Sequence, residues 1–360
     1  RRGLVIDAAL TAADLPEFDV AASHALYARV IAPLLPHLKG ITTLQIVADG
    51  PLARLPLGLL VSRPAKDADL LARYRNSRWL ADRFAIAVHP GIAALAAARS
   101  SGAPSRADRM LLAVADPALT GITPGTTPGT TQVAGMAGFV KLRGAQRGTA
   151  RTATAICAMQ PLPDTRREAE RVASMLGKQG TTTLLTGAQA SERELRQRSD
   201  NGDLARYRTL LFATHGLADN EASGEEPALV LAPASCSSND AAEDGLLSAS
   251  EIATLKLDAD LVILSGCNTA APGDALVGQP FSGLAQAFRQ AGARRLLVSH
   301  WSVDSAATAD LMTALFARGS HATAANLQAA MHDFRQRPGA LPYRSHPAFW
   351  APFVLVGDSR

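Results

Sequence analysis

The chain contains little cysteine and no long apolar run. Only Cys157, Cys236 and Cys267 occur among its 360 residues. Their odd number and irregular spacing exclude the disulfide framework of a small secreted domain, so we expect free thiols and a cytoplasmic protein. No apolar stretch reaches the roughly 18 residues of a membrane-spanning helix, and no long apolar segment follows Arg1 and Arg2. The sequence therefore predicts no membrane partner.

Clusters of basic residues and nucleotide-binding motifs are missing as well. The net charge is +4, but Lys and Arg are scattered and nowhere form a run of five or six. We therefore expect no direct nucleic-acid partner. The glycine-containing loop 272–278 matches neither GxxxxGK(S/T) nor GxGxxG, and no spacing of His, Cys, Asp and Glu indicates a structural zinc. The sequence predicts neither a metal nor an organic cofactor.

What the chain does contain is an alternation of β and α segments. Hydrophobic residues make up 47% of the sequence, which is enough for a large core. Short apolar runs predict strands, and apolar residues at helical spacing predict helices between them. This order predicts an α/β fold with a mostly parallel sheet flanked by helices. The expected strands are 43–47, 84–88, 110–115, 182–185 and 295–299, together with the apolar runs 207–216 and 260–269, and the expected helices are 92–98, 165–176, 191–198, 282–291 and 305–316.

Composition divides the chain into three parts. Residues 119–154 are rich in Thr, Pro and Gly, with a repeated Thr-Pro-Gly-Thr at 123–131 and little apolar periodicity. This composition is typical of a linker or a mobile insertion. We therefore predict an N-terminal lobe at 1–118, a linker at 119–160 and a second lobe at 161–360.

Two of the apolar runs end on residues that perform nucleophilic chemistry. The run from Tyr207 leads to His215 and Gly216, and the run from Asp260 leads to Cys267. Open α/β sheets place their active sites at the carboxyl ends of the strands. If the two strands are neighbours, about 4.8 Å apart, His215 can take the thiol proton of Cys267 and return it to a leaving amine. The N–H groups of Gly216 and Cys267 are then candidates for an oxyanion hole.

Each of these residues by itself has a simpler interpretation. Cysteine is among the most buried residue types, and a histidine at a strand end is commonly satisfied by a loop carbonyl. Two reactive residues at strand ends, each beside a glycine, favour function over coincidence. His300 follows another strand and could line a pocket or compete for the role of base. Cys157 and Cys236 fall in segments without periodicity, and we interpret both as incidental.

The ordered motifs resemble the CHAT domain, a caspase-like module related to separase and often found with tetratricopeptide repeats. Caspases carry the histidine about 50 residues before the cysteine, and here the separation is 52 (267 − 215). The likeness extends almost from end to end, through 48–56 with Leu59, 112–117, 162–163, 168–169, 214–216, 245–247, 251–252, 264–269, 292–293, 299–301, 346–347, 349–350 and Gly357.

The resemblance implies a regulated cysteine endopeptidase on a caspase-like α/β/α sandwich, with His215 as base and Cys267 as nucleophile. The first lobe would be a pseudo-protease without a dyad. Expected partners are a protein or peptide substrate and a regulatory partner or tetratricopeptide-repeat region, in a bacterial signalling or defence pathway. The substrate-binding residues that it implies are Trp301, Ser302, Asp304, Asp219 and Asp274, of which the acids would favour a basic P1 residue.

Two other functions remain open at this point. The chain could be a non-catalytic interaction scaffold, because a fold does not fix a function. It could also be a thiol hydrolase or acyltransferase that acts on small substrates. The presence of both His215 and Cys267 argues against the scaffold, which needs neither.

Overall fold

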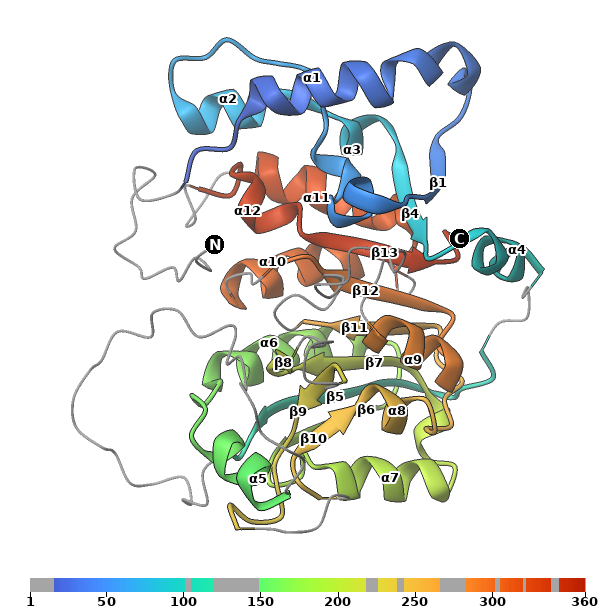
Figure 1. The fold of residues 1–360 in the computed structure, drawn as a ribbon, viewed down its shortest axis with the longest axis vertical. Helices are drawn as coiled ribbons and strands as arrows, with labels where there is room; N and C mark the ends of the chain where they lie inside the picture. The colour runs from blue at the N-terminus through green and yellow to red at the C-terminus, as the bar shows by residue number, and fades with distance from the viewer. Residues whose placement is uncertain are drawn as a thin grey trace.

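The chain forms one large sheet between two layers of helices (Figure 1). The computed structural model describes residues 16–100, 105–119, 149–217, 226–237, 243–265, 283–301, 305–319, 322–337 and 343–359. The predicted α/β/α sandwich with a mostly parallel sheet is confirmed. No helix within these ranges has the length and apolar character needed to cross a membrane.

The sheet consists of two blocks of parallel strands that run in opposite directions. Its eight strands follow the order β1-β4-β13-β12-β11-β7-β5-β6, and only the contact between β12 and β13 is antiparallel. We call β1-β4-β13 the three-strand block and β12-β11-β7-β5-β6 the five-strand block. The bounds are β1 (Thr43–Val47), β4 (Ala85–His89), β5 (Arg109–Pro117), β6 (Thr182–Gly187), β7 (Tyr207–Ala213), β11 (Leu261–Leu264), β12 (Arg295–Ser299) and β13 (Phe353–Gly357).

Helices cover both faces of the sheet, so its central strands are buried on both sides. Leu111, Leu211 and Ile263 pack on one face and Leu112, Leu210 and Val262 on the other. Strands buried in this way are continuous hydrophobic runs instead of alternating ones, which is why the sequence revealed them. The first face carries α6 (Pro163–Leu176), α10 (Ser305–Phe316), α11 (Ala324–Gln336) and α12 (Pro347–Trp350), and the second carries α7 (Glu192–Asp200), α8 (Ala249–Ile252) and α9 (Gly283–Ala291).

The helix α6 forms as the sequence predicts. Pro163 occupies its first turn, where the missing N–H costs nothing, and the helix ends before Gly177. Its buried residues repeat at helical spacing and turn one face to the sheet. One member of this buried face is a carboxylic acid, Glu168, which is 2% exposed.

Val61, Tyr74 and Trp79 of the N-terminal segments belong to the cluster on the first face of the sheet, and other N-terminal residues form a third apolar cluster with β1 and β4. It includes Tyr27, Leu57, Leu80 and Phe84. These segments are α1 (Val20–Val30), η2 (Ala32–Leu38), η3 (Gly50–Arg54), η4 (Leu57–Leu59), β2 (Val61–Arg63), α2 (Leu70–Asn76), β3 (Arg78–Trp79), α3 (Leu80–Arg83) and α4 (Ile92–Ser100).

The sheet crosses the predicted boundaries between the lobes. Strand β5 comes from the predicted N-terminal lobe, yet it lies between β6 and β7 of the second lobe. Three short strands, β8 (Gly216–Leu217), β9 (Ala228–Val230) and β10 (Leu246–Ser248), form a separate small sheet beside the five-strand block. The domain division stays a prediction, but the structure joins both parts through hydrogen-bonded strands.

One helix lies within the segment that the sequence predicts as a linker. Residues 149–157 form α5 (Thr149–Cys157), so the prediction that Cys157 lies in an irregular segment is wrong. Ala153 and Ile156 are buried on one side of this helix. Two buried residues are too few to produce a periodic signal in a segment rich in Thr and Ala.

Candidate active site

The strands β7 and β11 are neighbours and run parallel. Phe212 pairs with Leu264, and the N–H of Ser265 donates to the carbonyl of Phe212 at 2.9 Å. His215 comes three positions after Phe212, and Cys267 comes three positions after Leu264. Cys267 itself lies outside the described residues. The strand arrangement on which the predicted dyad depends is therefore present.

The backbone and the ring of His215 are both held. Its carbonyl accepts the N–H of Val230 in β9 at 2.9 Å, and the hydroxyl of Thr214 donates to the carbonyl of Val230 at 2.6 Å. Its ring nitrogen Nε2 lies 2.9 Å from the carbonyl oxygen of Gln160. A carbonyl oxygen can only accept, so Nε2 carries the proton and Nδ1 is left as the acceptor. In a neutral imidazole with this hydrogen bond, Nδ1 of the half-buried ring is the acceptor nitrogen.

The glycine after the histidine is buried at the start of β8. Gly216 pairs with Leu229, next to the bonded pair of His215 and Val230. Antiparallel pairs alternate between bonded and non-bonded positions, so the N–H of Gly216 points away from β9. This direction suits the predicted role of Gly216 as an oxyanion donor, and the second predicted donor, Cys267, lies outside the described residues.

A buried carboxylic acid lies against the end of β11. Glu168 of α6 makes a side-chain hydrogen bond with Ser265, two positions before Cys267. Burial raises the pKa of Glu168 to about 8, because an apolar environment disfavours the charged form. The Ser265 hydroxyl donates to the carboxyl group and opposes part of this rise, because its hydrogen bond favours the charged form. Glu168 was not among the predicted site residues, although an acidic residue on the apolar stripe of a predicted helix was the available signal.

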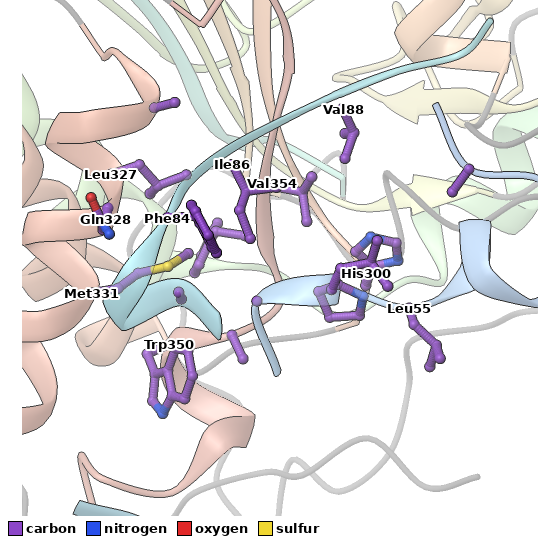
Figure 2. A pocket seen from close by; sticks show the side chains of 18 of the residues that line it. Leu55, Phe84, Ile86, Val88, His300, Leu327, Gln328, Met331, Trp350 and Val354 are labelled. Carbon is purple, nitrogen blue, oxygen red and sulfur yellow. The ribbon is translucent and has the colours of Figure 1, made fainter. Parts of the chain in front are cut away.

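His300 lines an apolar pocket and is a poor competitor for the role of base. It follows β12, and its backbone N–H donates to the carbonyl of Pro352 at 3.0 Å. The cavity of this pocket measures about 50 Å³, and Leu55, Val354 and Trp350 are among its walls (Figure 2). Burial lowers the pKa of His300 to about 4, so it binds a proton too weakly to act as a base near neutral pH.

Of the predicted substrate-binding residues, the structure describes Trp301 alone. Its indole N–H donates to the carbonyl of Ala348 at 3.0 Å, so this edge of the ring is held against α12. The other four, Ser302, Asp304, Asp219 and Asp274, lie outside the described residues. In the described part of the chain, no three His, Cys, Asp or Glu side chains gather as a metal site requires.

The structure corrects the interpretation of two cysteines. Cys157 at the end of α5 and Cys236 after β9 form a disulfide, although they are 79 positions apart in the chain. Sequence spacing could not reveal this pair, because only the packing of α5 beside the small sheet brings the two sulfurs together. The expectation of three free thiols is wrong, and the argument for a reducing compartment that rested on it no longer holds.

Comparison with known proteins identifies the family. The chain matches the CHAT domain over residues 20–358 and belongs to that family. No curated protein matches it. Among solved structures, it is similar to the crystal structure of the Arg-specific cysteine proteinase gingipain R, with 10% identity and a TM-score of 0.43, over 94% of this chain and 66% of that one. A second, described as the structure of a protease, has 11% identity and a TM-score of 0.42, over 97% and 70%.

These matches do not assign residues. The chain spans slightly less than two thirds of the gingipain chain, and we take no residue role from either structure. Family membership agrees with the predicted resemblance, while the site described above depends on the geometry of this chain alone.

Proposed function

We propose that the chain is a cysteine endopeptidase in which His215 is the general base and Cys267 is the nucleophile. The observation that carries the proposal is the register of β7 and β11, which pairs Phe212 with Leu264. His215 and Cys267 follow these paired residues by the same number of positions. Residues at equal offsets beyond neighbouring parallel strands leave the same edge of a sheet.

The tautomer of His215 supports this assignment. The carbonyl of Gln160 fixes the proton on Nε2, so Nδ1 is available to take the proton of the Cys267 thiol. The thiolate then attacks the carbonyl carbon of the scissile peptide bond. The N–H groups of Gly216 and Cys267 donate hydrogen bonds to the substrate carbonyl oxygen and stabilise the negative charge that develops on it.

The proton then moves to the leaving group. His215 gives it to the amide nitrogen as the C–N bond breaks, and the acyl group remains on the sulfur of Cys267. A water molecule, deprotonated by the same imidazole, attacks the thioester carbon. The C–S bond breaks, the product acid leaves and the thiol is restored.

The substrate in this proposal is a protein or peptide. Trp301, Ser302 and Asp304 would contact it beyond β12. The acids Asp304, Asp219 and Asp274 would select a basic P1 side chain by charge pairing. Cleavage would serve a bacterial signalling or defence pathway, under control of a regulatory partner or a tetratricopeptide-repeat region.

Active-site labelling tests the proposal directly. Wild type, Cys267→Ala and His215→Ala are treated with peptidyl acyloxymethyl ketones that carry Arg, Lys, Asp or Leu at P1, and adducts are measured by intact mass. We expect one adduct on wild type, at Cys267, and none on either variant. The P1 residue that labels fastest defines the specificity class.

A matched control is His300→Ala, which removes the histidine that follows the neighbouring strand β12. We expect it to be labelled at Cys267. Equal labelling of wild type and His215→Ala would remove the base assignment. A folded wild type that no ketone labels at Cys267 would favour the scaffold.

A further inference from the structure

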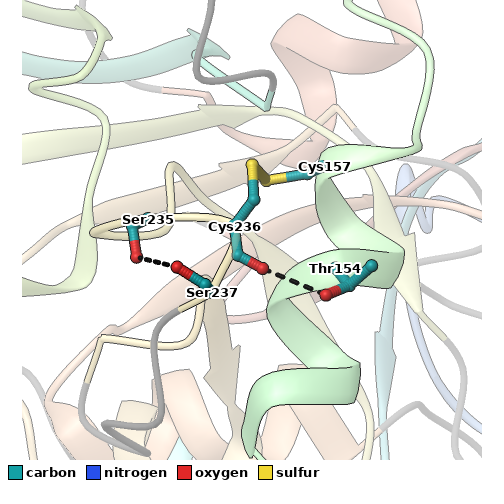
Figure 3. Close-up of a disulfide and its surroundings, with 5 residues drawn as sticks. All are labelled: Thr154, Cys157, Ser235, Cys236 and Ser237. Atoms are coloured by element: carbon teal, nitrogen blue, oxygen red, sulfur yellow. Dashed lines mark hydrogen bonds between the residues drawn. A yellow bond between two sulfur atoms is a disulfide. The ribbon is translucent and has the colours of Figure 1, made fainter.

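The disulfide fastens α5 to the loop that follows β9 (Figure 3). A hydrogen bond accompanies it, from the hydroxyl of Thr154 to the carbonyl of Cys236 at 3.0 Å. Both cysteines are half-buried, and Thr154, Ser235 and Ser237 around them are exposed. A small thiol reagent can therefore reach the bond from solvent.

One end of this link leads to the ring of His215. Gln160 follows Cys157 by three positions. A short turn lies between them, in which the N–H of Met159 donates to the carbonyl of Ile156 at 2.9 Å. The carbonyl of Gln160 then accepts the Nε2 proton of His215. The position of the end of α5 thus determines where the acceptor for the imidazole lies.

The other end leads to the backbone of the same residue. Cys236 follows Val230 of β9 by six positions, and the N–H of Val230 donates to the carbonyl of His215. The two supports of His215, one for its backbone and one for its ring, come from segments far apart in the chain. The disulfide is the covalent connection between these two segments.

Among the described residues, few apolar contacts hold α5 in this place. Ile156 belongs to a cluster with only two other fully buried members, Leu119 and Val230, and the partly buried Met159, Leu217 and Leu246 pack against it. The two clusters on the faces of the sheet are several times larger. The free energy of apolar burial scales with the buried area, so burial stabilises the position of α5 less than that of α6. A disulfide therefore supplies a larger share of the stabilisation for α5.

We propose that the Cys157–Cys236 disulfide is a redox-controlled clamp that orients His215 for catalysis. This inference rests on the proposed function, since it gives His215 the role of base. In the oxidised protein, Gln160 is held beside the imidazole. In the reduced protein, the end of α5 separates from the loop after β9 and the imidazole loses its fixed acceptor. The enzyme is then less active, although its nucleophile is a thiol.

The chemical step is thiol–disulfide exchange with a dithiol reductant. One thiolate of the reductant attacks a sulfur of the disulfide and forms a mixed disulfide, which releases the other cysteine as a thiolate. The second thiol of the reductant then attacks the mixed disulfide. Two electrons pass to the protein, two protons complete the thiols of Cys157 and Cys236, and the reductant leaves as its own disulfide.

The test compares labelling of Cys267 in buffers set to different ratios of reduced to oxidised dithiothreitol. The fraction of Cys157–Cys236 disulfide is measured by alkylation and mass. We expect the wild-type rate constant to be about ten- to a hundredfold higher in the oxidised form, the size of effect that a small misplacement of a catalytic group produces. Cys157→Ser/Cys236→Ser should show the low rate in every buffer. A double variant that labels as fast as oxidised wild type would overturn the clamp.

Two controls separate the clamp from other redox effects. In the double variant Cys267 is the sole remaining cysteine. A lower labelling rate of this variant in oxidising buffer therefore measures the oxidation of the nucleophile alone. Ser235→Ala removes a hydroxyl beside the disulfide without touching the bond. We expect its labelling rate to depend on the buffer as that of wild type does.

A second readout does not depend on catalysis. In the Cys267→Ala background, nitrogen-15 spectra of the His215 ring report which nitrogen carries the proton. We expect Nε2–H with the disulfide present and a mixture of tautomers in the triple variant with Cys157→Ser/Cys236→Ser. An unchanged tautomer overturns the clamp. If the tautomer changes in these spectra but Cys267 of the wild-type protein is never labelled, the peptidase proposal is rejected. The effect of the disulfide on His215 then still stands.

Discussion

The two blocks of the sheet each contain a strand that ends in or leads to a histidine, and the two histidines have different surroundings. His89 is the last residue of β4 in the three-strand block and is fully buried. His215 follows β7 in the five-strand block, is half-buried and has a carbonyl acceptor for its ring. A histidine after an apolar strand therefore does not by itself indicate a site.

The direction of the strands explains the difference. Strand β13 is antiparallel to β12 and parallel to β4, so the carboxyl ends of β4 and β7 lie at opposite edges of the sheet. His215 and His300 lie at the same edge of the sheet as the carboxyl end of β11, while His89 lies at the opposite edge. The polarity of a block thus determines which strand ends can contribute to one site.

The largest expected effect is the loss of the base. His215→Ala should lower the rate of Cys267 labelling by about a thousandfold or more, within the range of general-base contributions, with little change in the unfolding temperature. Labelling rates and thermal unfolding of the purified variant check this expectation.

The matched change in the other block is His89→Ala. It removes a fully buried ring, so we expect a loss of about 2–4 kcal/mol in the free energy of unfolding and an unchanged labelling rate per folded molecule. A slower rate of Cys267 labelling in the fully folded His89→Ala protein would show that the three-strand block also contributes to catalysis.

Removal of the disulfide should have the next largest effect, on stability. Cys157→Ser/Cys236→Ser opens a loop of 79 positions, and we expect a cost of about 2–5 kcal/mol. Chemical denaturation in the absence of reductant measures it. A cost below about 1 kcal/mol, at the low end of the range for disulfides, would show that α5 is held mainly by its apolar contacts and would count against the clamp.

The titration of Glu168 makes the free energy of unfolding depend on pH. Its folded-state pKa of about 8 exceeds its ordinary value of 4.5, so between these values the folded chain holds a proton that the unfolded chain has released. The stabilising contribution is complete below about pH 4.5 and is lost as the pH rises through about 8. Glu168→Gln should therefore unfold with a free energy about 2–4 kcal/mol above wild type at pH 9, since each pKa unit corresponds to about 1.4 kcal/mol.

Glu192 supplies the control for this titration. Burial raises its pKa to about 8 as well, but it lies on α7 at the other face and accepts the N–H of Gly245 at 2.7 Å. Glu168→Gln should therefore leave part of the pH dependence in place. A variant with the same pH dependence as wild type would contradict the assignment to Glu168.

The smallest expected effect concerns a helix cap beside the three-strand block. The carboxylate of Asp69 accepts the N–H of Ala72 at the start of α2 at 2.6 Å. Asp69→Ala should cost about 1 kcal/mol, without a change in the labelling rate of Cys267. Urea denaturation and labelling of the same sample measure both, and a large change in the rate would connect α2 to the site.

Much of the fold could be predicted because its elements are local. The strand at 43–47 and the helix at 305–316 have the predicted bounds, and α6 ends at the predicted Gly177. Apolar runs and helical spacing carry this information within a dozen residues. The helix α5 was missed because Ala153 and Ile156, its buried residues among those described, stand in a segment rich in Thr and Ala, and Ile156 packs on partners remote in sequence.

The sequence by itself determined the residue types of the candidate site, the strands that lead to them and the family. Tertiary structure alone decided that β7 and β11 are neighbours, that β13 reverses the direction of the sheet, and that Gln160 lies against His215. It also decided that Cys157 and Cys236 meet. The physical reason is that periodicity describes how one segment buries its own face, whereas register, direction and disulfide pairing depend on which distant segments pack together.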